Sequence, residues 1–299
     1  LVPRTNRGIF AITEIPDLAE RIQVGLLHVL EERDVQIRGY KIRLQLEVML
    51  VASANPEDYT NRGRIITPLK DRFGSQIRTH YPLDSGVEVA VMRQEARPMS
   101  VGDISVRTPD YMEQVVATLS QSARSSNQVN QRSGVSVRLS VSNLELLGAN
   151  ALRRALRAGE SDVVPRVSDL GALAASTGGK IEIESVEEGR EGAILEALVR
   201  ASVLMVFKER VPFDVVRDVV ATFEEGVVVH TGDDMPSTAI AQLVAQIPAL
   251  RAPVAGLTGG DESPAAIAAA VEFVLEGLHL SKRLNKDGSG ATVAYRGRG

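Results

Sequence analysis

Two polar side chains follow apolar segments that have the length of buried strands. Glu14 comes two residues after the run Gly8 to Ile12, and Asn55 comes three residues after the run Val48 to Ala52. At such a position a carboxylate can deprotonate a water that attacks a phosphate, and an amide can hold that water in place. The plainer alternatives are a helix cap for Glu14 and a strand-end turn of Asn55 with Pro56. Because the two side chains end two such runs, we expect a pair of catalytic groups.

Two arginines could contact a phosphate. Arg72 stands between Asp71 and Phe73-Gly74. It could form a surface ion pair with Asp71 or Asp84, or act as an arginine finger that stabilises negative charge during phosphoryl transfer. Arg138 opens a predicted helix, where the helix dipole does not favour a cation. This favours contact with an anionic phosphate over simple surface solvation, which stays open as the alternative.

The composition argues against several other kinds of site. The 299 residues contain no Cys and only four His, which are widely scattered, so we expect neither a disulfide nor a His- or Cys-ligated metal. A net charge of -4 gives no sign of a nucleic-acid partner. No apolar run approaches the length that crosses a bilayer, so we expect no membrane association and a cytoplasmic location.

The elements that would position Glu14, Asn55 and Arg72 alternate between strand and helix. Gly8 to Ile12 and Val48 to Ala52 have the continuous apolar pattern of strands buried on both faces. A helical pattern from Leu18 to Leu30 and a hairpin from Asp34 to Gln45, turning at Gly39-Tyr40, lie between them. A short helix around residues 68–72 and a third strand near residues 76–79 follow. This order predicts an α/β fold with a parallel sheet.

Beyond Asp84 the periodicity is mainly helical. The predicted helices cover residues 111–119, 144–156, 169–176, 193–207, 215–223, 238–246 and 264–278. Ser168 is the predicted N-cap of the helix that follows it. Residues 120–133 are expected to form a loop or a frayed helix end, and the Gly- and Pro-rich residues 250–263 a loop. Residues 282–299 are expected to form a disordered basic tail.

Several of these segments together resemble the AAA+ ATPases of the magnesium chelatase I subunit and MoxR-type group. RGIFAITEIPDL resembles the Walker B strand, DVQIRGYKIRL the pre-sensor hairpin, VASANPEDY the sensor 1 strand and PLKDRFG the arginine-finger segment. Val135 to Ser140 resembles the start of the sensor 2 helix, and Arg166 to Leu170 the start of a helix in the lid. The resemblance is specific over Leu1 to Asp84, extends less closely to about Arg210, and is absent beyond that residue.

The resemblance implies a fold and a set of roles. Residues 1–86 would be the later part of an AAA+ α/β core, residues 87–210 a helical lid and residues 211–281 a helical extension before the tail. Glu14 and Asn55 would act as Walker B base and sensor 1, Arg72 as the finger and Arg138 as the nucleotide-binding sensor 2. The cofactors would be ATP and Mg²⁺, and a finger that acts in trans implies a ring of identical subunits, expected to be a hexamer.

Two features depart from the family pattern. Thr13 stands where a Walker B motif normally carries Asp, and the phosphate-binding pattern G-x-x-x-x-G-K-[ST] does not occur. The sequence therefore predicts the C-terminal portion of a longer ATPase, which alone would not bind ATP in the usual way. Two alternatives stay open: a MoxR-type chaperone, which often works with a von Willebrand factor A-type protein, and a truncated, non-catalytic fragment.

Overall fold

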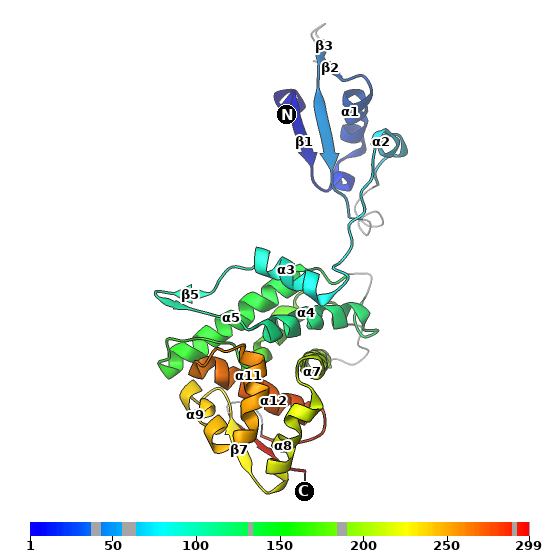
Figure 1. Cartoon of the computed structure of the whole chain (residues 1–299). Coiled ribbons are helices and arrows are strands. Elements are labelled where there is room, and N and C mark those ends of the chain that lie inside the picture. The colour runs from blue at the N-terminus through cyan, green and yellow to red at the C-terminus, as the bar shows by residue number, and fades with distance from the viewer. Residues whose placement is uncertain (37–42, 56–63, 131–133, 184–189, 289–291, 299) are drawn as a thin grey trace. The chain divides into compact units, whose positions relative to one another are not determined.

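The computed structural model describes residues 1–36, 43–55, 64–130, 134–183, 190–288 and 292–298 (Figure 1). The chain divides into two compact units, Leu1–His80 and Tyr81–Gly299. Helices occur together with small sheets, so the predicted mixed α/β class is confirmed at that level. Within the described part of the chain no single helix is long and apolar enough to cross a membrane. The pair Ser237–Gln246 and Pro248–Thr258 passes the same length and composition test only together, and it is bent by 107°.

The first unit follows the predicted alternation. Its elements in chain order are β1 (Gly8–Ile12), α1 (Glu20–Glu31), β2 (Asp34–Gln36), β3 (Arg43–Gln45), β4 (Val48–Ala52) and α2 (Thr67–Arg72). β1 and β4 pair in parallel, while β2 and β3 pair antiparallel as the two arms of the predicted hairpin. The expected turn at Gly39-Tyr40 lies outside the described residues.

Only one face of the β1–β4 pair is covered within the described part of this unit. Helices α1 and α2 pack on that face through the buried Leu26 and Leu69 (Figure 1). On the opposite face Ile9 is 66% exposed, Met49 64% and Val51 45%. The prediction that both strands are buried on both faces is therefore wrong here, because no described segment of the unit packs on the second face.

A buried glutamine fixes α2 against α1. The Gln23 amide nitrogen donates to the carbonyls of Leu18 at 2.9 Å and Arg64 at 3.0 Å, and its oxygen accepts from the Ile66 N–H at 2.9 Å. The bonds to Arg64 and Ile66 pair backbone groups of the segment that leads into α2, and the bond to Leu18 pairs one in the segment before α1. The α2 helix that carries Arg72 is thereby held on α1.

The third predicted strand is not formed. Residues 73–84, which include the expected strand at 76–79, contain neither helix nor strand, and Ile77 is 88% exposed. A strand is defined by hydrogen bonds to a neighbouring strand, and none of the described strands pairs with this segment. Local sequence pattern therefore predicted one strand more than the described part of this segment forms.

The second unit is mainly helical. Its helices are α3 (Ser85–Glu95), α4 (Asp110–Ser125), α5 (Arg138–Ala158), α6 (Leu173–Gly178), α7 (Glu191–Arg210), α8 (Phe213–Glu224), α9 (Ser237–Ala241), α10 (Leu243–Gln246), α11 (Arg251–Thr258) and α12 (Pro264–Leu280). The short strands β5 (Ser100–Val101) and β6 (Ile104–Ser105) form a hairpin between α3 and α4. The helices predicted beyond Asp84 occur in the expected order, but α3 was not predicted, and the helix expected at 238–246 is divided into α9 and α10.

Three boundaries differ from the prediction. α4 continues to Ser125, into the expected loop, because Ser120 and Ala123 are buried. α11 lies inside the stretch expected to be a loop, because Leu250 and Val254 are buried in the core despite the surrounding Gly and Pro residues. Ser168 caps no helix, since Arg166 is the N-cap of a 3₁₀ helix at Val167–Ala172, and its backbone N–H donates to the Asp169 carboxylate.

The described residues of the expected disordered tail, 282–288 and 292–298, include two strands, so that prediction is wrong for them. β7 (Val228–Thr231), β9 (Val293–Arg296) and β8 (Asn285–Asp287) form an antiparallel sheet in the order β7-β9-β8. Tyr295 is 2% exposed, and its hydroxyl donates to the Glu276 carboxylate at 2.6 Å. The prediction failed because β9 pairs with a strand more than sixty residues earlier in the sequence, and local periodicity carries no sign of such a partner.

One hydrophobic core joins most of the second unit. It contains residues from Met92 to Tyr295 and includes both sides of the predicted lid boundary at residue 210, such as Phe207 and Val216. α12 runs through it, in contact with α7, α9 and α11, and Figure 1 shows it surrounded by helices. Most α12 side chains are buried, as expected for a helix that is apolar on all sides.

Gly277 allows α7 to approach α12 closely. A Cβ added at this position would lie 2.1 Å from the Phe207 ring. We therefore expect Gly277→Ala to lower the free energy of unfolding by about 1–3 kcal/mol, as overpacked cores do. Urea denaturation measures this change. In Gly256→Ala, where an added Cβ meets no atom within 4 Å, stability should be unchanged or higher. Equal stability of the two variants would contradict the close approach of Gly277 to the Phe207 ring.

A buried charged network crosses the same core. The Arg166 guanidinium donates to the Met235 carbonyl at 2.9 Å, and its backbone N–H donates to the Asp169 carboxylate at 2.8 Å. Glu272, 2% exposed, accepts from the Ser168 N–H at 3.1 Å and lies 3.8 Å from the Arg166 guanidinium. Burial raises the pKa of Glu272, and the positive charge of Arg166 only partly opposes this.

The raised pKa of Glu272 predicts how the stability of the fold changes with pH. A carboxyl whose pKa is higher in the folded than in the unfolded protein stabilises the fold at low pH, and that contribution is lost as the pH rises through the folded-state pKa. Glu272→Gln, which cannot ionise, should therefore gain stability relative to wild type as the pH rises from about 4, near the unfolded pKa of Glu. Urea unfolding across this range, with the exposed Glu262→Gln as control, measures the difference. A difference that shrinks with rising pH would contradict this account.

Candidate functional site

Glu14 and Asn55 follow the ends of two strands that pair directly. In the parallel register Ile12 lies opposite Ala52. The pairing continues past the strands, because the Ser53 N–H donates to the Ile12 carbonyl at 2.9 Å and the Ile15 N–H donates to the Ser53 carbonyl at 3.0 Å. Glu14 and Asn55 are both exposed at this edge, which is where ligands bind in open α/β sheets.

The Glu14 backbone adopts an uncommon conformation. Its φ of 51° and ψ of 54° lie in the left-handed region, as do the φ values of three other non-glycine residues of the described chain, Arg7, Arg33 and Lys282. Glu14 is the N-cap of the 3₁₀ helix Ile15–Asp17, but its side chain makes no capping hydrogen bond. The helix-cap alternative therefore has no support, and the carboxylate is exposed at the edge.

Ser53 belongs to this edge, although sequence analysis did not single it out. Its hydroxyl oxygen accepts from the Glu14 N–H at 3.4 Å, while its backbone bridges β1 and the residues after it. The bond orients the Glu14 backbone from the neighbouring strand. In the sequence, only the position of Ser53 directly after the β4 run could have indicated that it belongs to this edge.

Thr13, which stands beside Glu14, is exposed as well. Its hydroxyl can offer a metal ion one neutral oxygen, where a carboxylate would offer charge. No cluster of three or more His, Cys, Asp or Glu side chains that could hold a metal occurs among the described residues. An ion at this edge would therefore depend on ligands from the substrate, from water or from other sequence.

Arg72 is the last residue of α2, as the short helix predicted around residues 68–72 implied. Its guanidinium lies 3.0 Å from the Asp71 carboxylate and 3.0 Å from that of Glu31, at the end of α1. The hydrogen bond to Glu31 and the negative charge of Glu31 raise the pKa of Arg72. The ion pair with Asp71 was expected as the plainer alternative, whereas that with Glu31 was not. The side chain keeps 35% exposure, so a second function of the guanidinium is compatible with both pairs.

Arg138 lies in the second unit, as the first residue of α5. Its side chain is exposed, and its backbone N–H donates to the Ser136 hydroxyl at 3.3 Å. The predicted helix start is therefore found at the expected residue.

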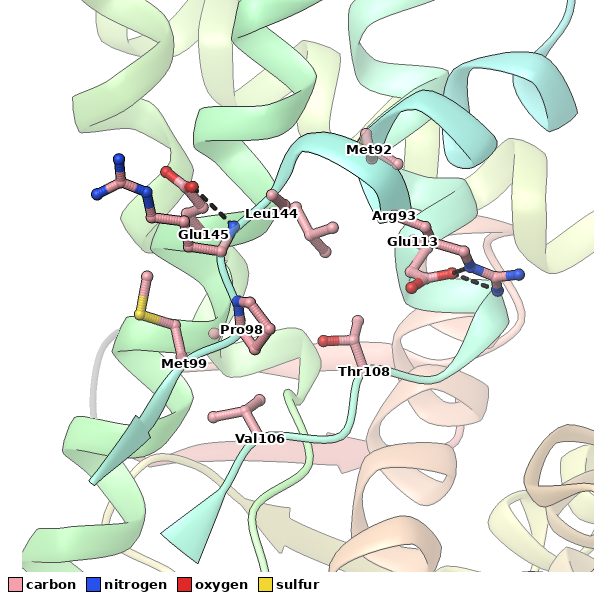
Figure 2. A pocket seen from close by; sticks show the side chains of 12 residues that line it. Met92, Arg93, Pro98, Met99, Val106, Thr108, Glu113, Leu144 and Glu145 are labelled. Atoms are coloured by element: carbon pink, nitrogen blue, oxygen red, sulfur yellow. Dashed lines mark hydrogen bonds and ion pairs between the residues drawn. The ribbon is translucent and has the colours of Figure 1, made fainter. Parts of the chain in front are cut away.

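The second unit also contains a cavity of about 200 Å³ that sequence analysis missed. Figure 2 shows Pro98, Val106, Thr108 and Leu144 around it, and the buried Glu113 beside them. Arg93 donates to the Glu113 carboxylate at 2.7 Å. Burial raises the pKa of Glu113, and Arg93 opposes the change. The lining comes from four segments between residues 92 and 148, so no local motif could have indicated it.

Comparison with known proteins adds no family to this description. No family model matches the chain, and no curated protein matches it.

Proposed function

We propose that this chain contributes the later half of an AAA+ ATPase core and its helical lid, in a protein that couples ATP hydrolysis to the remodelling of a partner. The observation that carries the proposal is the parallel β1–β4 pair, which has Glu14 and Asn55 just beyond the same end. The order of strand, helix, hairpin, strand and helix is the one that the resemblance to magnesium chelatase I and MoxR-type proteins implies.

Each of the four polar residues has a role in this proposal. Glu14 orients and deprotonates the attacking water, and Asn55 holds that water. Arg138 contacts phosphate from the lid, and Arg72 reaches the active site of a neighbouring subunit, which requires a ring, proposed to be a hexamer. The exposure of Glu14 and Arg138 supports access to a ligand, and the partial exposure of Arg72 supports access to a neighbour.

Residues outside the 299 would complete the site. The phosphate-binding pattern G-x-x-x-x-G-K-[ST] does not occur in the sequence, so in this proposal ATP and Mg²⁺ require a cradle that other sequence supplies. The open face of Ile9, Met49 and Val51 supports this view, because parallel sheets are normally covered on both faces. When bound, Mg²⁺ would neutralise phosphate charge. Position 13 could offer the ion only the neutral hydroxyl oxygen of Thr13.

Calorimetric titration with Mg·ATP tests the proposal. We expect the 299-residue chain to bind no more tightly than the millimolar range, and the full-length product of its gene to bind in the micromolar range. Glu14→Gln in the full-length product should bind equally well, because it leaves the phosphate cradle unchanged. Micromolar binding by the 299-residue chain would show that it forms its own cradle. Failure of the full-length product to bind would overturn the ATPase assignment.

A further inference from the structure

The first turn of α5, which begins with Arg138, is held by a buried polar contact and not by a side-chain cap. Val137, at the N-cap position, makes no side-chain capping bond. Two residues after Arg138, the buried Ser140 hydroxyl donates to the Glu88 carboxylate of α3 and lies 2.7 Å from the Ser120 hydroxyl of α4. The start of α5 is therefore fixed by Glu88.

Glu88 is in turn fixed by a partly buried arginine. Arg124 of α4 donates to both Glu88 carboxylate oxygens, at 2.6 and 2.8 Å, and Glu88 is fully buried. The same guanidinium donates from Nε to the Val135 carbonyl at 3.0 Å, in the segment that leads into α5. Bidentate pairs of this kind are directional as well as strong, so a shift of Arg124 displaces both Glu88 and residue 135.

Tyr81 contacts this arginine. The Arg124 guanidinium stacks 4.7 Å from the centre of the Tyr81 ring. The Tyr81 hydroxyl also packs against Gly134, where an added Cβ would lie 2.5 Å from it and where φ is 69°. Tyr81 is the first residue of the second unit and follows the stretch 73–80, which contains neither helix nor strand. One aromatic side chain thus contacts both the ion pair and the segment before Arg138.

We propose that Tyr81 is a positioning residue for Arg138, and that it links the segment entering the second unit to the start of α5 through Arg124, Glu88 and Ser140. A change in the path of residues 73–80 moves the ring, and the ring moves Arg124 and the turn before Arg138. The functional part of this inference rests on the proposed role of Arg138 in contacting nucleotide. The structural part, that Tyr81 holds the start of α5, does not depend on that role.

Hydrogen exchange of the 299-residue chain tests the structural part. Tyr81 is 45% exposed, so its replacement leaves the core intact, whereas replacing Glu88 would leave a buried charge unpaired. Tyr81→Ala should raise exchange of the residue 138–143 amides about three- to thirty-fold, the range that loss of a cation–π contact predicts. Tyr81→Phe, which keeps the ring face, and Leu83→Ala, at a neighbouring residue that is 85% exposed, should change it little. Equal exchange in Tyr81→Ala and wild type would overturn the inference.

A double-mutant cycle in the full-length gene product tests the functional part. Tyr81→Ala should weaken ATP affinity when Arg138 is present and have no further effect in Arg138→Ala, because its influence passes through that guanidinium. Independent, multiplying effects would show that Tyr81 does not act through Arg138. If Arg138→Ala itself leaves ATP affinity unchanged, the proposed nucleotide contact is wrong, and hydrogen exchange alone decides whether Tyr81 holds α5.

Discussion

Glu14→Gln in the full-length gene product is expected to lower kcat for ATP hydrolysis by about 10²–10⁴-fold, the usual effect of removing a general base. The amide keeps the size of the carboxylate but cannot accept the proton of the attacking water. ATP affinity and subunit assembly should be preserved, because the Glu14 side chain makes no capping hydrogen bond on which the local fold depends. Steady-state hydrolysis assays measure the effect.

The matched control is Asp17→Asn, which removes another exposed carboxylate three residues away, in the 3₁₀ helix that follows Glu14. This variant should retain wild-type turnover. If Glu14→Gln also turned over ATP at the wild-type rate, Glu14 would have no catalytic role, and the β1–β4 edge would lose its proposed chemistry.

Arg72→Ala should also abolish most hydrolysis, since an arginine finger contributes about 10³–10⁵-fold to kcat. The domain should stay folded, because the ion pairs of Arg72 with Glu31 and Asp71 are partly exposed and surface pairs contribute little to stability. Arg72→Lys can keep a charge near Glu31 but lacks the planar guanidinium, so it should be nearly as inactive as Arg72→Ala. Full activity in Arg72→Lys would indicate that Arg72 acts only through its charge.

Mixing two inactive variants separates a finger that acts in trans from one that acts within its own subunit. An Arg72→Ala subunit has an intact Glu14, and a neighbouring Glu14→Gln subunit has an intact Arg72. Mixed rings should therefore regain part of the activity, although neither variant is active alone. If mixed rings stay inactive while subunit exchange is demonstrated, Arg72 does not act between subunits.

Local sequence pattern predicted the described helices and strands of the first unit, although it also predicted a third strand at residues 76–79 that is not formed. Apolar runs bounded by polar residues indicated β1 and β4, and the helical spacing of Leu26 and its neighbours indicated α1. The carboxyl ends of two parallel strands meet at one edge, so Glu14 and Asn55 were predicted at one location. Exposure of the second face could not be predicted, because an apolar run has the same pattern whether or not a layer covers it.

Contacts between distant residues account for the features that were missed. β9 pairs with β7, and Glu88 pairs with Arg124 across helices, so neither feature has a local periodicity. Helix α11 was hidden by the Gly and Pro residues around it, whereas burial of Leu250 and Val254 in the shared core stabilises it. Tertiary packing overrode propensity at each of these places.

The structure of the full-length gene product with a non-hydrolysable Mg·ATP analogue tests the central claim most directly. The account predicts the γ-phosphate at the carboxyl end of β1 and β4, with Glu14 and Asn55 of the same subunit facing it across one water. Arg138 of that subunit should contact the phosphates, and Arg72 of the adjacent subunit should point into the site. A nucleotide bound elsewhere, or a monomer that leaves Glu14 and Asn55 facing bulk solvent in the presence of saturating nucleotide, would contradict it.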